Sequence, residues 1–176
     1  MGYRGDAAPG TEQAVAVGVQ LFRDQRKDAD AYLIGYRQLG PEERERYVSS
    51  PDDIARSVTR MAGELIRHKG GLPGKLDGWD YTPDKMLAVS DAFDVFIGGD
   101  IERLKCNAEK GLLHTNMVLE LDIVFYVGKV REGVVHRRPV SMKTERIAPT
   151  FGPRELRQFL NDMLSQALER GFRDIP

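Results

Sequence analysis

The chain has 176 residues, and its 26 lysines and arginines nearly balance its 27 aspartates and glutamates. This length suits one domain that buries roughly 70% of the surface of its unfolded chain, so no disulfide or metal is needed for folding. The single cysteine, Cys106, excludes an intramolecular disulfide and indicates a reducing compartment or indifference to redox. Residues 1–10 lack the pattern of a signal peptide, and no apolar run approaches the roughly 20 residues of a membrane span, so we expect a cytoplasmic protein without a membrane partner.

The first predicted helix covers residues 11–39. Thr11 is a suitable N-cap, and Glu12 suits the positive end of the helix. Apolar residues then recur at steps of three and four, as in the seam of a coiled coil, once Arg26 is allowed as an interruption: Val15, Val19, Phe22, Ala29, Leu33 and Tyr36. Such a seam needs a second helix against it, either from the same chain or from a second copy.

A short charged helix is expected over residues 41–47, followed by the clearest helix start in the sequence. Ser50 can cap this next helix, Pro51 suits its first turn, and Asp53 can reach back to the cap. The helix is expected to continue with an apolar stripe until the glycines that follow Lys69.

Residues 70–82 are rich in glycine and are predicted to form a loop. Because it is long and carries Trp79 and Tyr81, we expect this loop to be packed down or used for binding. Thr82 and Pro83 predict another helix that ends at the glycine pair 98–99, and a last short helix is expected over residues 100–110.

From residue 113 the apolar period changes to two, which is the strongest strand signal in the chain. Alternate apolar residues share one face: Met117, Leu119, Leu121, Ile123, Phe125 and Val127. A hairpin loop over 128–133 would return the chain to about residue 147, with Leu119 opposite Met142 and Val127 opposite Val134. Gly152 and Pro153 predict a final helix, ending at Gly171, whose apolar face covers the hairpin.

The predicted fold is therefore a single α+β domain over residues 1–176. Its first two-thirds, about 11–111, would be helical. An antiparallel β-hairpin or small sheet packed by a C-terminal helix would follow over about 113–171.

No motif in the sequence identifies an enzyme, a cofactor or a metal site. His68, His114 and His136 are far apart, and Cys106 has no activating motif beside it. Acidic and basic residues on the two hairpin strands, among them Glu120, Asp122 and Lys143, resemble a metal-dependent nuclease set. Alternating charges on a solvated sheet give the same pattern. An enzyme is thus the less favoured class.

Charge is segregated along the chain. Residues 77–102 carry seven acids against one base, whereas residues 128–157 carry eight bases against three acids. The two segments could meet between chains, or they could neutralise each other within one fold. The candidate interaction residues are Arg131, Arg137, Arg138, Lys143, Arg146, Asp84, Asp91 and Asp94.

Three functions follow from this pattern. The leading hypothesis is a non-enzymatic protein-protein interaction or assembly subunit that binds itself or other protein subunits, such as a structural component of a virion or secretion apparatus assembled in the cytoplasm. The alternative is a nucleic-acid-binding accessory protein that uses the basic hairpin. The third hypothesis is a metal-dependent hydrolase.

Overall fold

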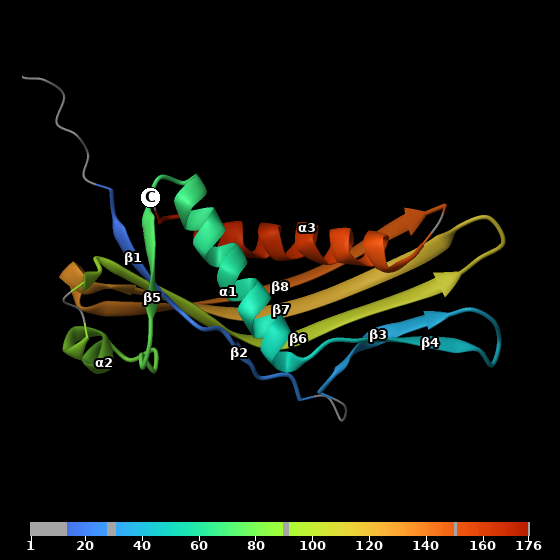
Figure 1. Cartoon of the computed structure of the whole chain (residues 1–176), viewed down its shortest axis with the longest axis horizontal. Coiled ribbons are helices and arrows are strands. Elements are labelled where there is room, and N and C mark those ends of the chain that lie inside the picture. The colour runs from blue at the N-terminus through green and yellow to red at the C-terminus, as the bar shows by residue number, and fades with distance from the viewer. Residues whose placement is uncertain (1–13, 28–30, 90–91, 150, 176) are drawn as a thin grey trace, which may run out of the picture.

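A computed structural model describes residues 14–27, 31–89, 92–149 and 151–175. It is built on a curved, mixed, eight-stranded sheet (Figure 1). The strands are β1 (Ala16–Gln20), β2 (Arg23–Asp24), β3 (Leu33–Gln38), β4 (Arg44–Val48), β5 (Leu72–Leu76), β6 (Val95–Lys110), β7 (Thr115–Lys129) and β8 (Val134–Ala148). The helices are α1 (Pro51–His68), α2 (Pro83–Ala88) and α3 (Pro153–Gly171), and a 3-10 turn covers Val130–Glu132.

The long strand β6 organises the sheet. Along one edge it pairs with β7, which in turn pairs with β8, and both pairings are antiparallel. Along its other edge it pairs in succession with the parallel strands β1, β2 and β3. Strand β5 extends the sheet beyond β1, and β4 extends it beyond β3. Segments from both halves of the chain therefore meet along β6.

The predicted helical first two-thirds of the chain is wrong, because this region contributes most of the strands. The expected helix over 11–39 is replaced within the described residues by β1, β2 and β3, and the expected helix over 41–47 is largely strand β4. Val17 and Val19 are buried in β1. The same segment also contains an alternation of β-branched residues, Val15, Val17 and Val19. This alternation favours a strand once the neighbouring strands are present.

The expected short helix over 100–110 is also wrong, because these residues belong to β6. Gly98 and Gly99 do not end a helix. A Cβ atom at Gly98 would lie 2.7 Å from the ring of Tyr81, and one at Gly99 would lie 2.6 Å from the ring of Phe22. The glycines therefore allow aromatic rings to pack on both faces of the strand. A bulge between Ile101 and Arg103 then interrupts the alternation that would have revealed a strand.

The strand prediction for β7 is confirmed, and so is its apolar face. Met117, Leu119 and Leu121 are fully buried. The hairpin register differs from the expected one by two residues, since Leu119 lies opposite Thr144 and Leu121 opposite Met142. A shift of two leaves every side chain on its predicted face.

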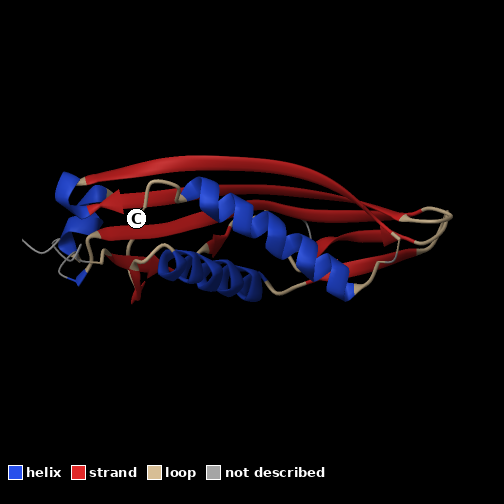
Figure 2. Ribbon diagram, turned by 90° about the horizontal axis from the view of Figure 1, so that it is seen from above, coloured by secondary structure: helices blue, strands red, loops and turns tan. Residues whose placement is uncertain are grey.

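The predicted starts of α1 and α3 are confirmed, although the Ser50 side chain makes no capping hydrogen bond. Each begins at a proline in its first turn, and α3 ends at Gly171 as predicted. Figures 1 and 2 show both helices on one face of the sheet, where Phe159 and Met163 of α3 join the same core as Leu121. A second, smaller core of Leu76, Trp79, Tyr81, Met86 and Phe96 lies near α2.

Candidate functional site

The loop between β5 and α2 packs onto the sheet through its aromatic residues. The Tyr81 hydroxyl accepts a hydrogen bond from the Gly99 amide at 3.1 Å and donates one to the Gly99 carbonyl at 3.2 Å. The Trp79 amide donates to Gln20 Oε1 at 3.2 Å, and the Trp79 indole nitrogen donates to the Thr82 carbonyl at 3.1 Å. Trp79 and Tyr81 are both buried, so the loop is held in one position.

Tyr81 belongs to a layered cluster of four side chains. The Tyr81 ring stacks on the Tyr126 ring, with centroids 4.2 Å apart and planes 13° apart. The Arg23 guanidinium carbon lies 4.3 Å from the centroid of the Tyr81 ring, within reach of a cation-π interaction. Arg23 also donates to both carboxylate oxygens of Asp100, at 2.6 and 2.8 Å. This bidentate geometry fixes the guanidinium plane.

The backbone and the ionisation of this cluster are both unusual. Tyr81 has a φ of 70°, a left-handed conformation that a bulky residue rarely adopts. Burial raises the pKa of Tyr81 to about 12, so its hydroxyl stays protonated at neutral pH. The Asp100 side chain is only 12% exposed, whereas the Arg23 side chain is 47% exposed. Strain and a nearly buried charge are features that gather at functional sites.

The cluster lies on the face of β6, β7 and β8 opposite α1 and α3. We call this the helix-free face because neither long helix covers it; the short helix α2 packs on one end of it through Met86. Charged side chains cross this face in rows set by the register of the strands. Arg103 pairs with Asp122 at 3.2 Å and with Glu120 at 3.5 Å, and Lys143 pairs with Glu120 at 3.4 Å. These are ordinary cross-strand ion pairs, exposed and individually weak.

Two hollows follow one another along the helix-free face. The first, of about 500 Å³, is lined by Gln25, Lys27, Asp100, Glu102, Arg103, Lys105 and Asp122. The second, of about 480 Å³, is lined by Tyr36, Gln38, Arg44, Asn107, Ala108, Glu109, Asn116 and Val118. From Asp100 to Glu109 the strand spans roughly 30 Å at its usual rise per residue. The face is therefore long enough for an extended segment of another molecule.

Comparison with known proteins supports the fold alone. No protein-family model matches the sequence, and no curated protein matches it significantly. Protein XCC0632 from Xanthomonas campestris, of the DUF330 family, aligns over 92% of this chain and 85% of its own, with 9% identity and a TM-score of 0.56. An uncharacterized protein aligns over 93% of this chain and all of its own, with 11% identity and a TM-score of 0.50. The fold thus resembles that of solved proteins, and no activity follows from the likeness.

The basic residues predicted to act together are divided between the two faces of β8. Arg137 and Lys143 lie on the helix-free face. Arg138 and Arg146 lie on the other face, where Arg138 donates to Asp174 at 3.0 Å and Arg146 to Asp162 at 2.9 Å. The alternation of side chains in a strand separates them. The basic hairpin is therefore not one continuous basic surface.

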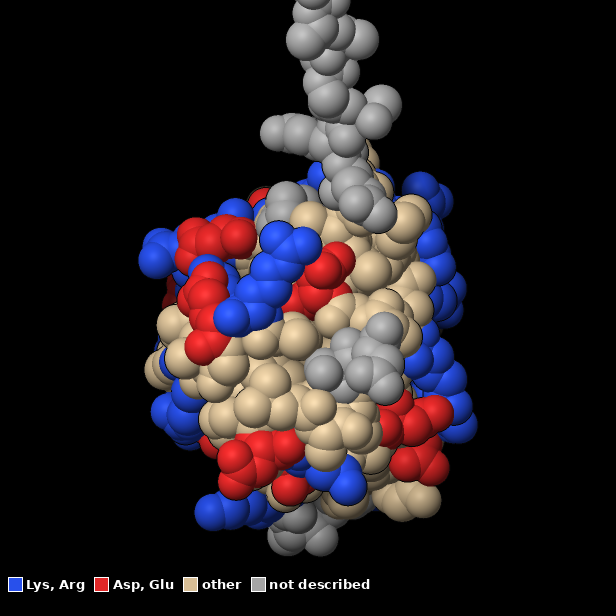
Figure 3. Space-filling view, turned by 90° about the vertical axis from the view of Figure 1, so that its left-hand side faces the viewer, with Lys and Arg blue, Asp and Glu red and all other residues tan. Residues whose placement is uncertain are grey.

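The acidic residues predicted to act with them are also dispersed. Asp84 is exposed on α2, and Asp91 lies outside the described residues. Asp94 accepts a hydrogen bond from the Ala16 amide at 3.1 Å and lies 3.8 Å from Arg131 of the same chain. Asp94 and Arg131 line a third hollow, of about 750 Å³, at the end of the molecule that faces the viewer in Figure 3. Charges of both signs are interspersed there with uncharged surface.

The prediction of a homo-oligomeric subunit or virion component is wrong in the structural features on which it depended. That hypothesis depended partly on a coiled-coil seam in residues 11–39, and the described part of this segment forms strands of the sheet instead. It also depended on opposed charges meeting between chains, yet Arg131 and Asp94 meet within one chain. Labels such as structural protein, homo-oligomer and virion component therefore no longer follow from the fold.

Sequence reasoning did not identify Arg23, Asp100 or Tyr126 as site residues. Arg23 and Asp100 are 77 positions apart, and only the parallel pairing of β2 with β6 brings them together. The available signal was Tyr81 in a glycine-rich loop, which the sequence marked as packed or binding. It did not indicate which strand the loop would contact.

Among the described residues, no three or more His, Cys, Asp or Glu side chains come together in a group that could hold a metal ion. The carboxylates of Glu120 and Asp122 face basic partners instead. Cys106 is fully buried, and burial raises the pKa of its thiol to about 12, as suits an inert thiol. None of the described helices combines the length and the apolar character needed to cross a bilayer.

Proposed function

We propose that this chain is a non-enzymatic binding protein that holds a protein partner on its helix-free face. The observation that carries this proposal is the cluster of Tyr81, Tyr126, Arg23 and Asp100, which is fixed in place on the face that α1 and α3 leave uncovered. A partner meets the half-exposed Arg23 guanidinium there, which the buried Tyr81 and Asp100 already hold in one orientation, so little side-chain entropy is lost on binding.

The balance of charge on this face favours a protein partner over a polyanion. Bases and acids occur in similar numbers along it: Arg23, Lys27, Arg103, Lys105, Arg137 and Lys143 against Asp100, Glu102, Glu120, Asp122 and Glu145. A nucleic acid requires clustered cations, whereas protein surfaces present both signs. The nucleic-acid hypothesis has weaker support because Arg137 and Arg138 lie on opposite faces.

A photo-crosslinking amino acid at Ser141, an exposed position of β8 on this face, tests the proposal in cells of the source organism. A matched probe at Arg60, exposed on α1, serves as the control. We expect a protein to crosslink at Ser141 and not at Arg60. The identified protein would then be purified and titrated against wild type, Arg103→Glu/Lys143→Glu and the control Arg56→Glu/Arg60→Glu.

Tight binding that only the Arg103→Glu/Lys143→Glu variant loses would support the proposal. Equal loss in both double variants would contradict it. The proposal would also be contradicted if wild type retarded DNA or RNA at low salt, Arg137→Gln/Arg138→Gln reduced this retardation, and no protein crosslinked at Ser141.

A further inference from the structure

The tip of the hairpin between β6 and β7 presents two adjacent leucines to solvent. Leu112 is 103% exposed and Leu113 is 86% exposed, so neither packs on its own chain. The turn is closed by a hydrogen bond of 2.7 Å from the Gly111 amide to the His114 carbonyl. Single exposed apolar residues are common, but a pair with no contact at the apex of a turn is not explained by folding.

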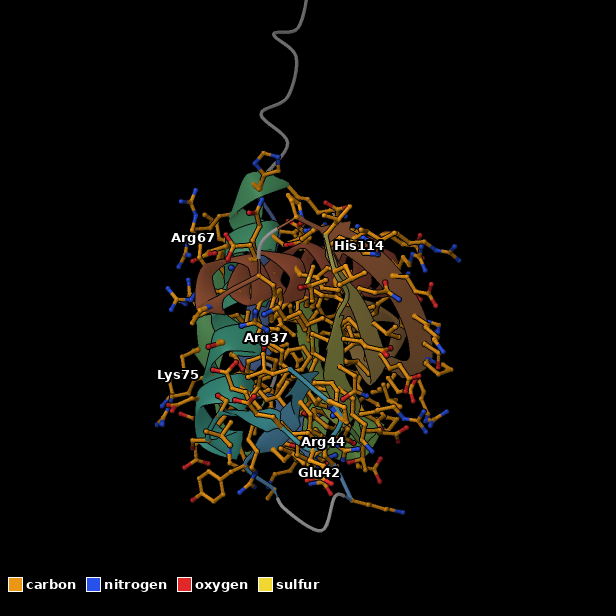
Figure 4. All side chains as sticks on the ribbon, turned by 90° about the vertical axis from the view of Figure 1, so that its right-hand side faces the viewer. Arg37, Glu42, Arg44, Arg67, Lys75 and His114 are labelled. Carbon is orange, nitrogen blue, oxygen red and sulfur yellow. The ribbon has the colours of Figure 1, made fainter. Side chains whose placement is uncertain are left out.

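The tip also stands at the end of the molecule. β6 and β7 extend for 16 and 15 residues, and Figure 1 places their turn beyond the end of α3. Ile147, on the neighbouring strand β8 opposite Asn116, is 67% exposed and adds a third apolar side chain near this end. In Figure 4, which looks onto this end, His114 lies apart from Glu42 and Arg44 of the neighbouring hairpin.

We infer that this tip inserts Leu112 and Leu113 into the interface of an anionic lipid bilayer. The leucines form a convex wedge, and a bilayer adapts to such a shape without a matching pocket. Lys110 directly precedes the turn and forms no ion pair within the described residues. Its charge would lie at the depth of the head groups and attract anionic lipid. The inference departs from the sequence-based expectation of no membrane partner.

This contact is independent of the partner proposed for the helix-free face, because it uses different residues at the end of the sheet. It is a reversible contact of a hairpin tip, and two leucines with one lysine predict weak binding that depends on both lipid charge and apolar insertion. Salt should weaken the part of the binding contributed by Lys110 and leave the apolar part.

Flotation of the full chain with phosphatidylcholine vesicles, with and without phosphatidylserine, tests the inference. We expect wild type to float with the anionic vesicles and Leu112→Ser/Leu113→Ser to lose roughly tenfold or more in affinity. The control Leu21→Ser/Leu87→Ser changes two residues that are 47% and 52% exposed elsewhere, and it should bind like wild type. Lys110→Gln should weaken binding to anionic vesicles only.

Thermal unfolding should be the same in wild type and in the tip variant, which excludes misfolding as the cause of any loss. A wild type that floats with neither vesicle overturns the inference, and so does equal loss in both leucine pairs. Binding of a purified protein that only the tip variant loses, without flotation of the wild type, would assign the tip to a protein pocket instead. Arg103→Glu/Lys143→Glu should float like wild type whatever becomes of the helix-free face.

Discussion

The hydroxyl of Tyr81 and the backbone of Gly99 satisfy each other completely, with one hydrogen bond in each direction at 3.1 and 3.2 Å. Tyr81→Phe would leave both backbone groups of Gly99 without this partner in a buried place. We expect the free energy of unfolding to fall by about 1 to 3 kcal/mol. Urea denaturation measures the change.

Tyr47→Phe is the matched control for Tyr81→Phe. The Tyr47 hydroxyl is buried without a hydrogen-bond partner among the described residues. Its removal should be neutral or slightly stabilising, since no bond is lost. Equal destabilisation by the two substitutions would show that the bonds to Gly99 contribute nothing.

Stability should decline at alkaline pH because of the same tyrosines. Burial raises the pKa of Tyr81 to about 12 and that of Tyr47 to about 12, above the ordinary value of 10.0. Below pH 10 both the folded and the unfolded chain keep these protons, so the stability is fully present. Between about pH 10 and 12 the unfolded chain releases them first, so the free energy of unfolding falls. The decline should be shallower in Tyr81→Phe, and an unchanged slope would contradict the assignment.

The ion pair of Arg23 and Asp100 should be strongly coupled. Arg23→Met leaves without its partner the carboxylate of Asp100, whose side chain is only 12% exposed. Since the Arg23 side chain is 47% exposed, we expect a loss of about 1 to 3 kcal/mol, below the value for a fully buried pair. The double variant Arg23→Met/Asp100→Leu should lose less free energy of unfolding than the sum of the losses in the two single variants, as a double-mutant cycle would measure. Additive losses would mean that the pair does not interact.

Gly99→Ala should destabilise the sheet because the new methyl group has no space. It would meet the Phe22 ring at 2.6 Å and the Val124 carbonyl oxygen at 2.8 Å. Overpacking of this kind costs about 1 to 3 kcal/mol. Gly152→Ala, whose nearest neighbour is the tip of Glu155 at 3.3 Å, is the control and should lower the melting temperature much less.

Leu121→Ala tests the core between β7 and α3. Leu121 is fully buried, and its removal should create a cavity that costs about 2 to 5 kcal/mol. Chemical denaturation provides the measurement. A loss below about 1 kcal/mol would mean that this side chain is not packed as the structure shows.

The predictable parts of the fold were those determined by neighbours in sequence. The prolines at 51 and 153 located the starts of α1 and α3, and the apolar alternation from 117 to 127 identified β7. The parts that failed depend on distant partners. β1 becomes a strand because β5 and β6 lie on either side of it, and local spacing cannot show that. The candidate site could not be predicted for the same reason, because its four residues come from four separate segments of the chain.

The place of β1 between β5 and β6 has a consequence for synthesis on the ribosome. Its residues emerge before those of both its neighbours in the sheet, which are translated several tens of residues later. At about 5 to 20 residues per second, β1 waits for seconds without a partner for its backbone. By contrast, β7 follows β6 directly in sequence and can pair with it at once. We therefore expect the hairpin of β6 and β7 to form soon after it is translated and β1 to join the sheet late, so that β1 stays accessible to proteases although it is translated before both of its partners.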